Sequence, residues 1–226
     1  MIKIKNLFKT YPPHQEAIRG LSLRVLKGDF LFIAGASGAG KSTLLKLMLG
    51  QERLTQGEMV INNVDMKNFT PKDLISLRRD IGIVFQDYKL LLNKNIIDNV
   101  SYGLEIKGYP KKERYEMALK ILKSLKLEDR AYDMPMTLSG GEQQRIAVAR
   151  ALIHKPSLIL ADEPTGNLDA QMTSVVFDLL LEANAAGVTV VVATHNLSII
   201  EELNLRTIVL DHGKIIGDYD NPRGNE

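Results

Sequence analysis

The chain has 226 residues, 45% of them hydrophobic and 25% charged, which suits one α/β domain with a sizeable core and argues against wholesale disorder. A net charge of +2 gives no reason to expect a nucleic-acid-binding protein, and the lack of cysteine excludes disulfides and thiolate metal sites. The longest apolar runs are far shorter than the ~20 residues of a membrane-spanning helix, and the first residues lack a signal-peptide core. We therefore expect a cytoplasmic protein, consistent with a reducing compartment, that reaches a membrane only through a partner.

Apolar residues alternate with polar ones near the start of the chain, which predicts antiparallel strands over 1–11 and 17–29. An apolar strand over 29–35, a glycine loop and a helix over 42–50 follow. The pattern next predicts two short strands around Asn62–Asn63 and a strand over 80–87. Residues 87–155 are rich in Lys, Glu and Leu and predict an inserted helical subdomain with helices at 96–106 and 111–125. The remaining pattern predicts buried parallel strands at 157–163 and 188–195, with a helix between them at 171–186. A closing hairpin at 207–219, turning at His212–Gly213, and a frayed tail at 221–226 end the chain.

The glycine loop reads GASGAGKS and matches the spacing G-x-x-x-x-G-K-[ST] of a phosphate-binding loop. Its glycines allow backbone N–H groups to turn around phosphate oxygens, and Lys41 can reach the β- and γ-phosphates. Ser42 can ligate Mg²⁺, and Thr43 can contact a phosphate at the helix N-terminus. The alternative is a plain glycine turn, but strand, loop and helix all agree with a nucleoside triphosphate site, whose candidate residues are Gly35, Ser37, Gly38, Ala39, Gly40, Lys41, Ser42 and Thr43.

Two carboxylates, Asp162 and Glu163, end the buried strand LILADE. A charge at such a position needs a partner, and Mg²⁺ supplies one for Asp162. Glu163 can orient and polarise an attacking water. The alternative, an acid pair that caps a helix before Pro164, loses weight beside a phosphate loop.

The segment LSGGEQQR at 138–145 predicts a second anion site at a helix N-terminus. Ser139 can cap the helix with Glu142 three residues later, as in a capping box, and Gly140 and Gly141 allow close approach of the backbone. Two phosphate sites in one chain suggest that two copies share nucleotides head to tail.

With the phosphate loop and LADEPTGNLD, this segment resembles the ABC transporter-type ATPases over essentially the whole chain. The resemblance implies an α/β P-loop fold with a mixed sheet. It implies a RecA-like core with an N-terminal antiparallel β-subdomain over 1–86 and 156–226, and a helical signature subdomain over 87–155.

The same resemblance implies roles for single residues in ATP and Mg²⁺ binding. Ser139, Gly140 and Gly141 close over the γ-phosphate bound by the other protomer of an ATP-dependent homodimer, although many members carry Gln at position 142. Tyr11 stacks on adenine. The remaining assignments are Gln86 as a switch residue near Mg²⁺ and the γ-phosphate, His195 as the γ-phosphate switch and Asp169 in the loop that crosses the interface. Lys41, Gln86, Glu163 and His195 are thus the catalytic candidates, and Ser42, Gln86 and Asp162 the metal candidates.

The segment after Gln86, FQDYKLL and then IIDNV, resembles the bacterial cell-division branch of this family. That branch implies a polytopic membrane partner through which ATP turnover signals to a peptidoglycan hydrolase, with the ATPase bound peripherally at the cytoplasmic face. A subunit of a lipoprotein-releasing or macrolide-efflux transporter is the main alternative. Ribosomal and DNA-repair relatives are disfavoured because the chain has one cassette and no coiled coil, and a GTPase because no N-K-x-D motif occurs.

Overall fold

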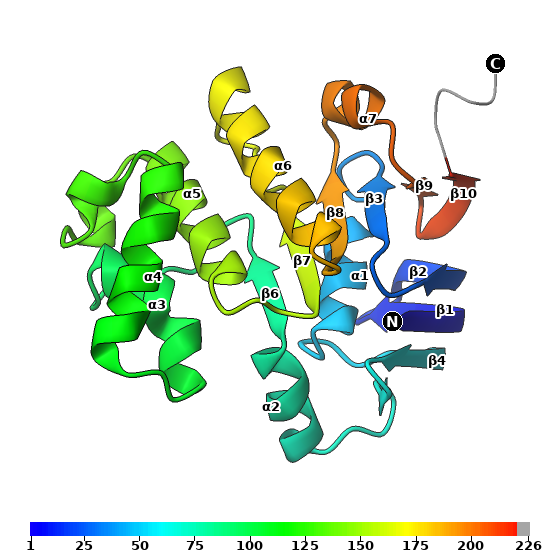
Figure 1. Ribbon diagram of the computed structural model, residues 1–226. Coiled ribbons are helices and arrows are strands. Elements are labelled where there is room, and N and C mark those ends of the chain that lie inside the picture. Colours follow the sequence, from blue (N-terminus) through cyan, green and yellow to red (C-terminus); the bar gives the residue numbers. More distant parts are fainter. Residues whose placement is uncertain (221–226) are drawn as a thin grey trace. The chain divides into compact units, whose positions relative to one another are not determined.

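Residues 1–220 are described by the computed structural model, and the tail predicted at 221–226 lies outside them. The chain, whose elements are labelled in Figure 1, divides into two compact units. The first unit contains residues 1–78 and the part of the chain from Thr189 onward, and the second contains residues 79–188. No helix within residues 1–220 is long and apolar enough to cross a membrane.

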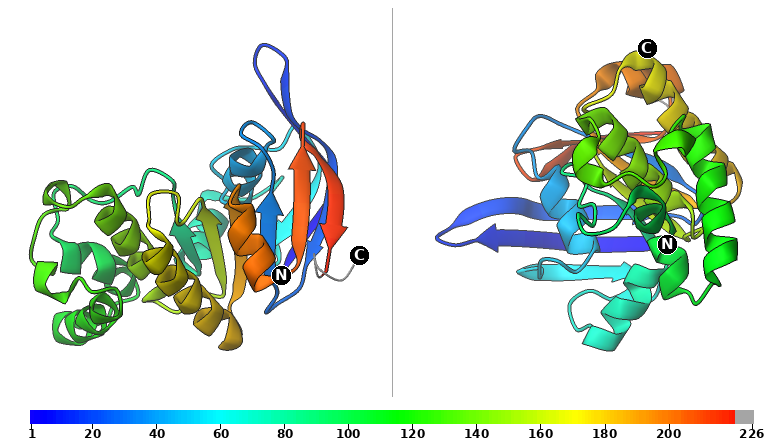
Figure 2. Two further views of the ribbon diagram at one scale, coloured as in Figure 1. Left: turned by 90° about the horizontal axis from the view of Figure 1, so that it is seen from above. Right: turned by 90° about the vertical axis from the view of Figure 1, so that its left-hand side faces the viewer.

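The first unit contains the predicted antiparallel sheet, with strand order β2-β1-β4-β5. Strands β1 and β2 form a long hairpin, visible as the blue arm in Figure 2, and β4 pairs with the other side of β1. The alternation read from the sequence is real, because Ile2 and Ile4 are buried while Lys3 and Lys5 are exposed. The strands are β1 (Ile2–Tyr11), β2 (Gln15–Val25), β4 (Gln56–Ile61) and β5 (Val64–Asp65).

The same unit also contains a parallel set of strands, in which β3 lies between β8 and β9. Every residue of β3 and β8 is buried, which explains their unbroken apolar sequences. Strand β10 pairs antiparallel with β9 as the predicted closing hairpin. These strands are β3 (Phe30–Ala34), β8 (Thr189–Thr194), β9 (Thr207–Asp211) and β10 (Lys214–Tyr219).

Three helices belong to this part of the chain: α1 (Lys41–Met48), α2 (Pro71–Arg79) and α7 (Leu197–Leu203). Only α1 follows from the sequence pattern, since it buries Leu44, Leu45, Leu47 and Met48. Helix α2 buries only Leu77, and α7 has seven residues, so neither carries enough apolar periodicity to predict.

In the second unit two parallel strands, β6 (Ile81–Val84) and β7 (Leu158–Asp162), enclose a long helical insertion. Helices α3, α4 and α5 pack on one another and are drawn in green in Figure 1. The bounds of the first two, Ile96–Ile106 and Lys111–Ser124, agree with the prediction, and α5 covers Gly140–Leu152. Two 3-10 turns, Glu128–Arg130 and Pro135–Thr137, lead into α5.

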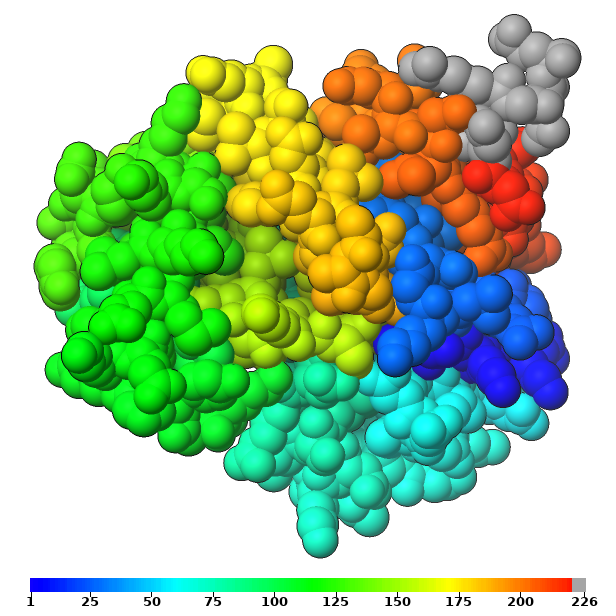
Figure 3. Space-filling model, in the orientation of Figure 1, coloured from blue at the N-terminus to red at the C-terminus, as the bar shows by residue number. Residues whose placement is uncertain are grey.

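Helix α6 (Ala170–Ala185) follows β7 and confirms the helix expected near 171–186. It lies at the surface, where Figure 3 draws it in yellow and orange. Its buried side chains, Met172, Val176, Phe177 and Leu180, recur at helical spacing and form its inner face.

Candidate functional site

The loop between β3 and α1 has a backbone that only glycine can adopt at two of its positions. Gly35 has φ +151°, and a Cβ there would lie 2.4 Å from the carbonyl oxygen of Leu210. Gly40 has φ +110°, and its Cβ would lie 2.8 Å from the carbonyl oxygen of Ala17. These glycines therefore serve both backbone conformation and close packing.

The loop presents the N-terminus of α1 together with one ammonium group. Gly40 is the N-cap and supplies no side chain to the first-turn N–H groups, so this helix end is suited to an anion. Lys41 is only 8% exposed, and its Nζ donates to the carbonyl oxygens of Gly35 at 2.6 Å and Ala36 at 3.2 Å. Ser42 and Thr43 lie half-buried in the first turn, while Ser37 and Gly38 are exposed.

The closing hairpin of the first unit supports this loop, a contact that the sequence did not reveal. The amide of Gly213, in the β9–β10 turn, donates to the carbonyl oxygen of Ala39 at 3.0 Å. The carbonyl oxygen of Gly213 accepts in turn from the amide of Arg19 in β2 at 2.9 Å. The glycine loop is thus hydrogen-bonded to the β9–β10 turn, and through that turn it is linked to β2.

His195 and the glycine loop lie at the same edge of the parallel strands. Ala34, the last residue of β3, pairs with Thr194, the last residue of β8, so Gly35 and His195 leave the sheet side by side. His195 is exposed there. Tyr11 ends β1 and is half-buried, with the Nζ of Lys9 4.5 Å from its ring centroid.

In the second unit, Gln86 and the two carboxylates are brought together in the same way. Val84 pairs with Ala161, so Gln86 and Asp162 follow neighbouring ends of β6 and β7. Glu163 has φ +48°, an uncommon value for a residue with a side chain and one that recurs at functional sites.

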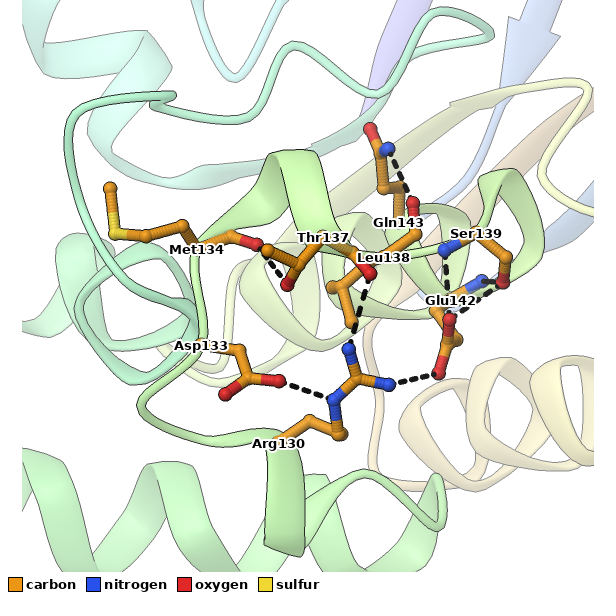
Figure 4. Close-up of polar contacts among 8 residues, drawn as sticks. All are labelled: Arg130, Asp133, Met134, Thr137, Leu138, Ser139, Glu142 and Gln143. Atoms are coloured by element: carbon orange, nitrogen blue, oxygen red, sulfur yellow. Dashed lines mark hydrogen bonds and ion pairs between the residues drawn. The ribbon is translucent and has the colours of Figure 1, made fainter.

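The N-terminus of α5 carries the capping box that the sequence predicts (Figure 4). The Oγ of Ser139 accepts from the amide of Glu142 at 3.3 Å. The Oε2 of Glu142 accepts from the amide of Ser139 at 2.8 Å and from its Oγ at 2.7 Å. The pKa of the Glu142 carboxyl is lowered, first by the hydrogen bonds from Ser139 and then by the charges of Arg130 and Arg145, while burial opposes the shift.

Two other loops pack against the glycines at the start of α5. A Cβ at Gly140 would lie 2.9 Å from the Oη of Tyr88, and one at Gly141 would lie 3.2 Å from the carbonyl oxygen of Asn167. The Nδ2 of Asn167 donates to the Oη of Tyr88 at 2.8 Å. The loops after β6 and β7 and the start of α5 thus meet at one point, where glycine gives the closest packing.

Arg150 of α5 is hydrogen-bonded to the loop after β6. Its guanidinium donates to the carbonyl oxygens of Tyr88 and Lys89, both at 2.7 Å, and burial lowers its pKa. Tyr88 and Lys89 have φ values of +62° and +49°, so two successive residues adopt the left-handed conformation. The sequence singled out YKLL only as a marker of the branch, and nothing in it indicated that Arg150 would fix this turn.

Asp169 has a local role that the sequence reading missed. It is exposed and is the N-cap of α6, accepting from the amide of Met172 at 2.8 Å. A cap of this kind stabilises a helix by ~1 kcal/mol, so the residue has a structural function whatever it contacts in an assembly.

Comparisons with known proteins show which proteins the chain resembles. Residues 18–166 match a family model described as ABC transporter. The chain is 39% identical to the cell division ATP-binding protein FtsE of Bacillus subtilis (strain 168) over 96% of each chain. It is 40% identical to the methionine import ATP-binding protein MetN of Carboxydothermus hydrogenoformans over 96% of this chain and 65% of that protein. A solved dimer of the ATP-binding cassette MJ0796, in a post-hydrolysis state bound to ADP and Pi, is similar with a TM-score of 0.92 and 37% identity over 97% of this chain and 98% of that one. The α/β fold class expected from the sequence is confirmed.

Proposed function

The chain belongs to the ABC transporter family of ATPases, and from this premise we propose that it is the ATP-hydrolysing subunit of a cell-division complex of the FtsE type. Two observations support the proposal: the N-termini of α1 and α5 are both suited in principle to an anion, which favours an ATPase of two copies, and the 39% identity to FtsE favours the cell-division role. A single ATP needs only the first. Two copies arranged head to tail use both, each α5 closing over the nucleotide held by the other copy.

Within one copy, the glycine loop and α1 bind the phosphates and Tyr11 stacks on the adenine. Lys41, already held among the loop carbonyls, places its charge beside the β- and γ-phosphates. The phosphate-binding residues are Gly35, Ser37, Gly38, Ala39, Gly40, Lys41, Ser42 and Thr43. In the other copy, Ser139, Gly140 and Gly141 receive the γ-phosphate, and Asp169 lies in the loop that crosses the interface.

The oxygen donors fit a magnesium ion that is shared with the phosphates. Ser42, Gln86 and Asp162 would hold it, and these hydroxyl, amide and carboxylate groups are the ligands that Mg²⁺ takes. No group of three or more His, Cys, Asp or Glu residues within residues 1–220 could hold a metal ion. The ion would neutralise charge on the phosphate oxygens.

In hydrolysis, Glu163 orients the water for in-line attack on the γ-phosphorus and takes up its proton. His195, at the same strand edge as the glycine loop, supports the γ-phosphate through a hydrogen bond. Gln86 lies two residues past the end of β6, and Asp162 ends the neighbouring strand β7, so we expect the two residues to respond together to the nucleotide. Loss of the γ-phosphate removes the anion that joins the two copies, and the dimer opens.

The membrane partner in this proposal is a polytopic protein of the FtsX type. ATP-driven closure changes the partner's conformation, and that signal activates a peptidoglycan hydrolase outside the membrane. The chain is accordingly peripheral, at the cytoplasmic face. The second candidate is a subunit of a transporter of the lipoprotein-releasing or macrolide-efflux type, and the similarity to an import protein, MetN, keeps a transport role open.

Co-purification of a Glu163→Gln variant with ATP tests the proposal. The variant should bind ATP, fail to turn it over and remain closed, so that its partner stays bound during gentle extraction. A small polytopic protein with a large extracytoplasmic loop, together with a cell-wall hydrolase, would support the division role. A lipoprotein-release or efflux permease would assign the same chemistry to transport, and unchanged turnover would remove Glu163 from catalysis.

A further inference from the structure

One guanidinium group ties together the segment that leads into α5 (Figure 4). The Nε of Arg130 donates to the Oδ2 of Asp133. Its two terminal nitrogens donate to the Oε1 of Glu142 and to the carbonyl oxygen of Thr137, each at 3.2 Å. The fork of donors on arginine makes such a threefold contact possible, which a lysine ammonium would not reproduce.

The two oxygens of Glu142 have different partners. Oε1 accepts from Arg130, while Oε2 accepts both the amide and the hydroxyl of Ser139. The hydroxyl hydrogen of Ser139 is therefore engaged by Glu142. To donate to a phosphate oxygen, the Ser139 hydroxyl must break its hydrogen bond to the Oε2 of Glu142. The Glu142 carboxylate then lies beside the incoming phosphate with its negative charge unchanged.

This carboxylate creates an electrostatic problem at the proposed γ-phosphate site. The N-terminus of α5 attracts anions through its dipole and its backbone N–H groups. A carboxylate in the same first turn already interacts with the positive end of the helix dipole, and its charge repels a second anion. An uncharged amide of the same length would not repel it, so a glutamate at this position needs a neighbouring cation.

We propose that Arg130 is a positioning residue for the trans contact with ATP, because it neutralises Glu142 and holds the carboxylate back from the phosphate that Ser139 receives. This inference rests on the proposed function, in which α5 of one copy closes over the nucleotide of the other. Asp133 completes the arrangement by fixing the other side of the guanidinium. Arg130 and Glu142 thus set how readily the dimer closes, and they leave nucleotide binding by the glycine loop unaffected.

The test measures dimer closure by light scattering as ATP is titrated onto the full chain carrying Glu163→Gln. In this background, Arg130→Met should raise the ATP concentration for half-maximal closure by roughly fivefold, the size expected for one uncompensated charge near the surface. Glu142→Gln should close at the parent's ATP concentration or below it. The double variant Arg130→Met/Glu142→Gln should return to the level of Glu142→Gln, because the charge that Arg130 offsets is gone. The defect of Arg130→Met should also shrink as salt is raised.

A purely structural role for Arg130 predicts a different pattern. The bond to Thr137 is lost in both Arg130→Met variants, so a double variant as impaired as the single one would overturn the proposal. An Arg130→Met variant that closes like its parent would overturn it as well. Arg130→Gln, which removes the charge but keeps a polar side chain, serves if Arg130→Met does not fold. It should show a similar rise, and closure at the parent's ATP concentration would again overturn the proposal. If the parent itself forms no dimer with ATP, the proposed function and this inference both fail, whereas the other negative results affect Arg130 alone.

Discussion

Lys9 lies beneath Tyr11, with its Nζ 4.5 Å from the centre of the aromatic ring. The lysine is only 8% exposed, and the same nitrogen donates to the Oε2 of Glu52 at 2.8 Å and to the carbonyl oxygen of Arg53 at 2.9 Å. The ammonium is therefore fixed by the chain that follows α1. One face of the ring rests on this cation, so the adenine stacking proposed for Tyr11 would use the other face.

Replacement of Lys9 by Met should therefore weaken nucleotide binding by holding Tyr11 less well. A cation over an aromatic ring stabilises the arrangement by about 0.5–2 kcal/mol, so we expect a loss of affinity of roughly two- to thirtyfold by calorimetry. Lys5→Met is the matched control, because Lys5 is exposed on the same strand and should have no effect. Equal affinities for Lys9→Met and Lys5→Met would show that the cation does not support the base.

The loss of the Lys41 ammonium should be more severe. Lys41→Ala removes the charge that the loop carbonyls hold beside the phosphate-binding N-terminus of α1, and we expect ATP affinity to fall at least tenfold. Lys46→Ala removes an exposed lysine from the same helix and should bind as the parent does. Unchanged ATP binding by Lys41→Ala in calorimetry would contradict the assignment of the glycine loop.

The contact between Tyr88 and Gly140 predicts that the effect of one substitution depends on the other. Alanine favours a helix over glycine by up to ~1 kcal/mol, but at Gly140 its Cβ would meet the Oη of Tyr88 at 2.9 Å. Gly140→Ala should therefore destabilise the parent, by about 1 kcal/mol, and should be neutral or stabilising in a Tyr88→Phe background, where the nearest ring carbon is 3.9 Å away.

Thermal unfolding of the four proteins in this cycle measures the dependence directly. Gly108→Ala cannot serve as a control for a glycine-to-alanine change, because Gly108 has φ +84°, a backbone conformation in which alanine is strained. Gly140 is not among the glycines with positive φ. The same destabilisation by Gly140→Ala in both backgrounds would mean that the Tyr88 hydroxyl does not limit the space at α5.

The sequence was sufficient for those parts of the site that one continuous segment builds. The glycine loop, the capping box at Ser139 and the strand ending in Asp162 were all predictable, because spacing within a segment determines each of them. The hydrogen bond between Tyr88 and Asn167 was not predictable, since 79 positions separate the two residues and the motif that each belongs to says nothing about the other.

The same limit applies to the supports of the loops. Arg150 reads as one more charged residue on a helix, and only the fold shows that it holds two carbonyls of the loop after β6. Gly213 reads as a hairpin turn, yet it also fastens the glycine loop. Contacts between distant segments depend on how the strands are ordered, which local periodicity does not encode.

His154 predicts an acid-side loss of stability. Burial lowers its pKa, the charge of Lys107 adds to the effect, and backbone acceptors at Arg150 and Ile81, with the charge of Asp80, oppose it. The folded state thus favours the neutral ring, whereas the unfolded chain takes up a proton below pH ~6.5. Since the unfolded state then binds more protons, the free energy of unfolding should fall as pH drops below that value, by at most about 1.4 kcal/mol per pH unit for this group.

Denaturant unfolding at pH 7.5 and pH 5.5 should separate this histidine from the other titrating groups. In His154→Gln the loss of stability between the two pH values should be smaller than in the parent, by roughly 1 kcal/mol, whatever the variant's absolute stability. His14→Gln is the control, because His14 is exposed and its replacement should leave the difference unchanged. The Nδ1 of His154 lies 3.0 Å from where a Cβ at Gly103 would be, so the ring packs closely against α3. If parent and His154→Gln lose the same stability between these pH values, the acid sensitivity in this range does not come from His154. Glu142 is not its source either, because a carboxyl whose pKa is lowered in the folded state loses its stabilising contribution only at more acidic pH.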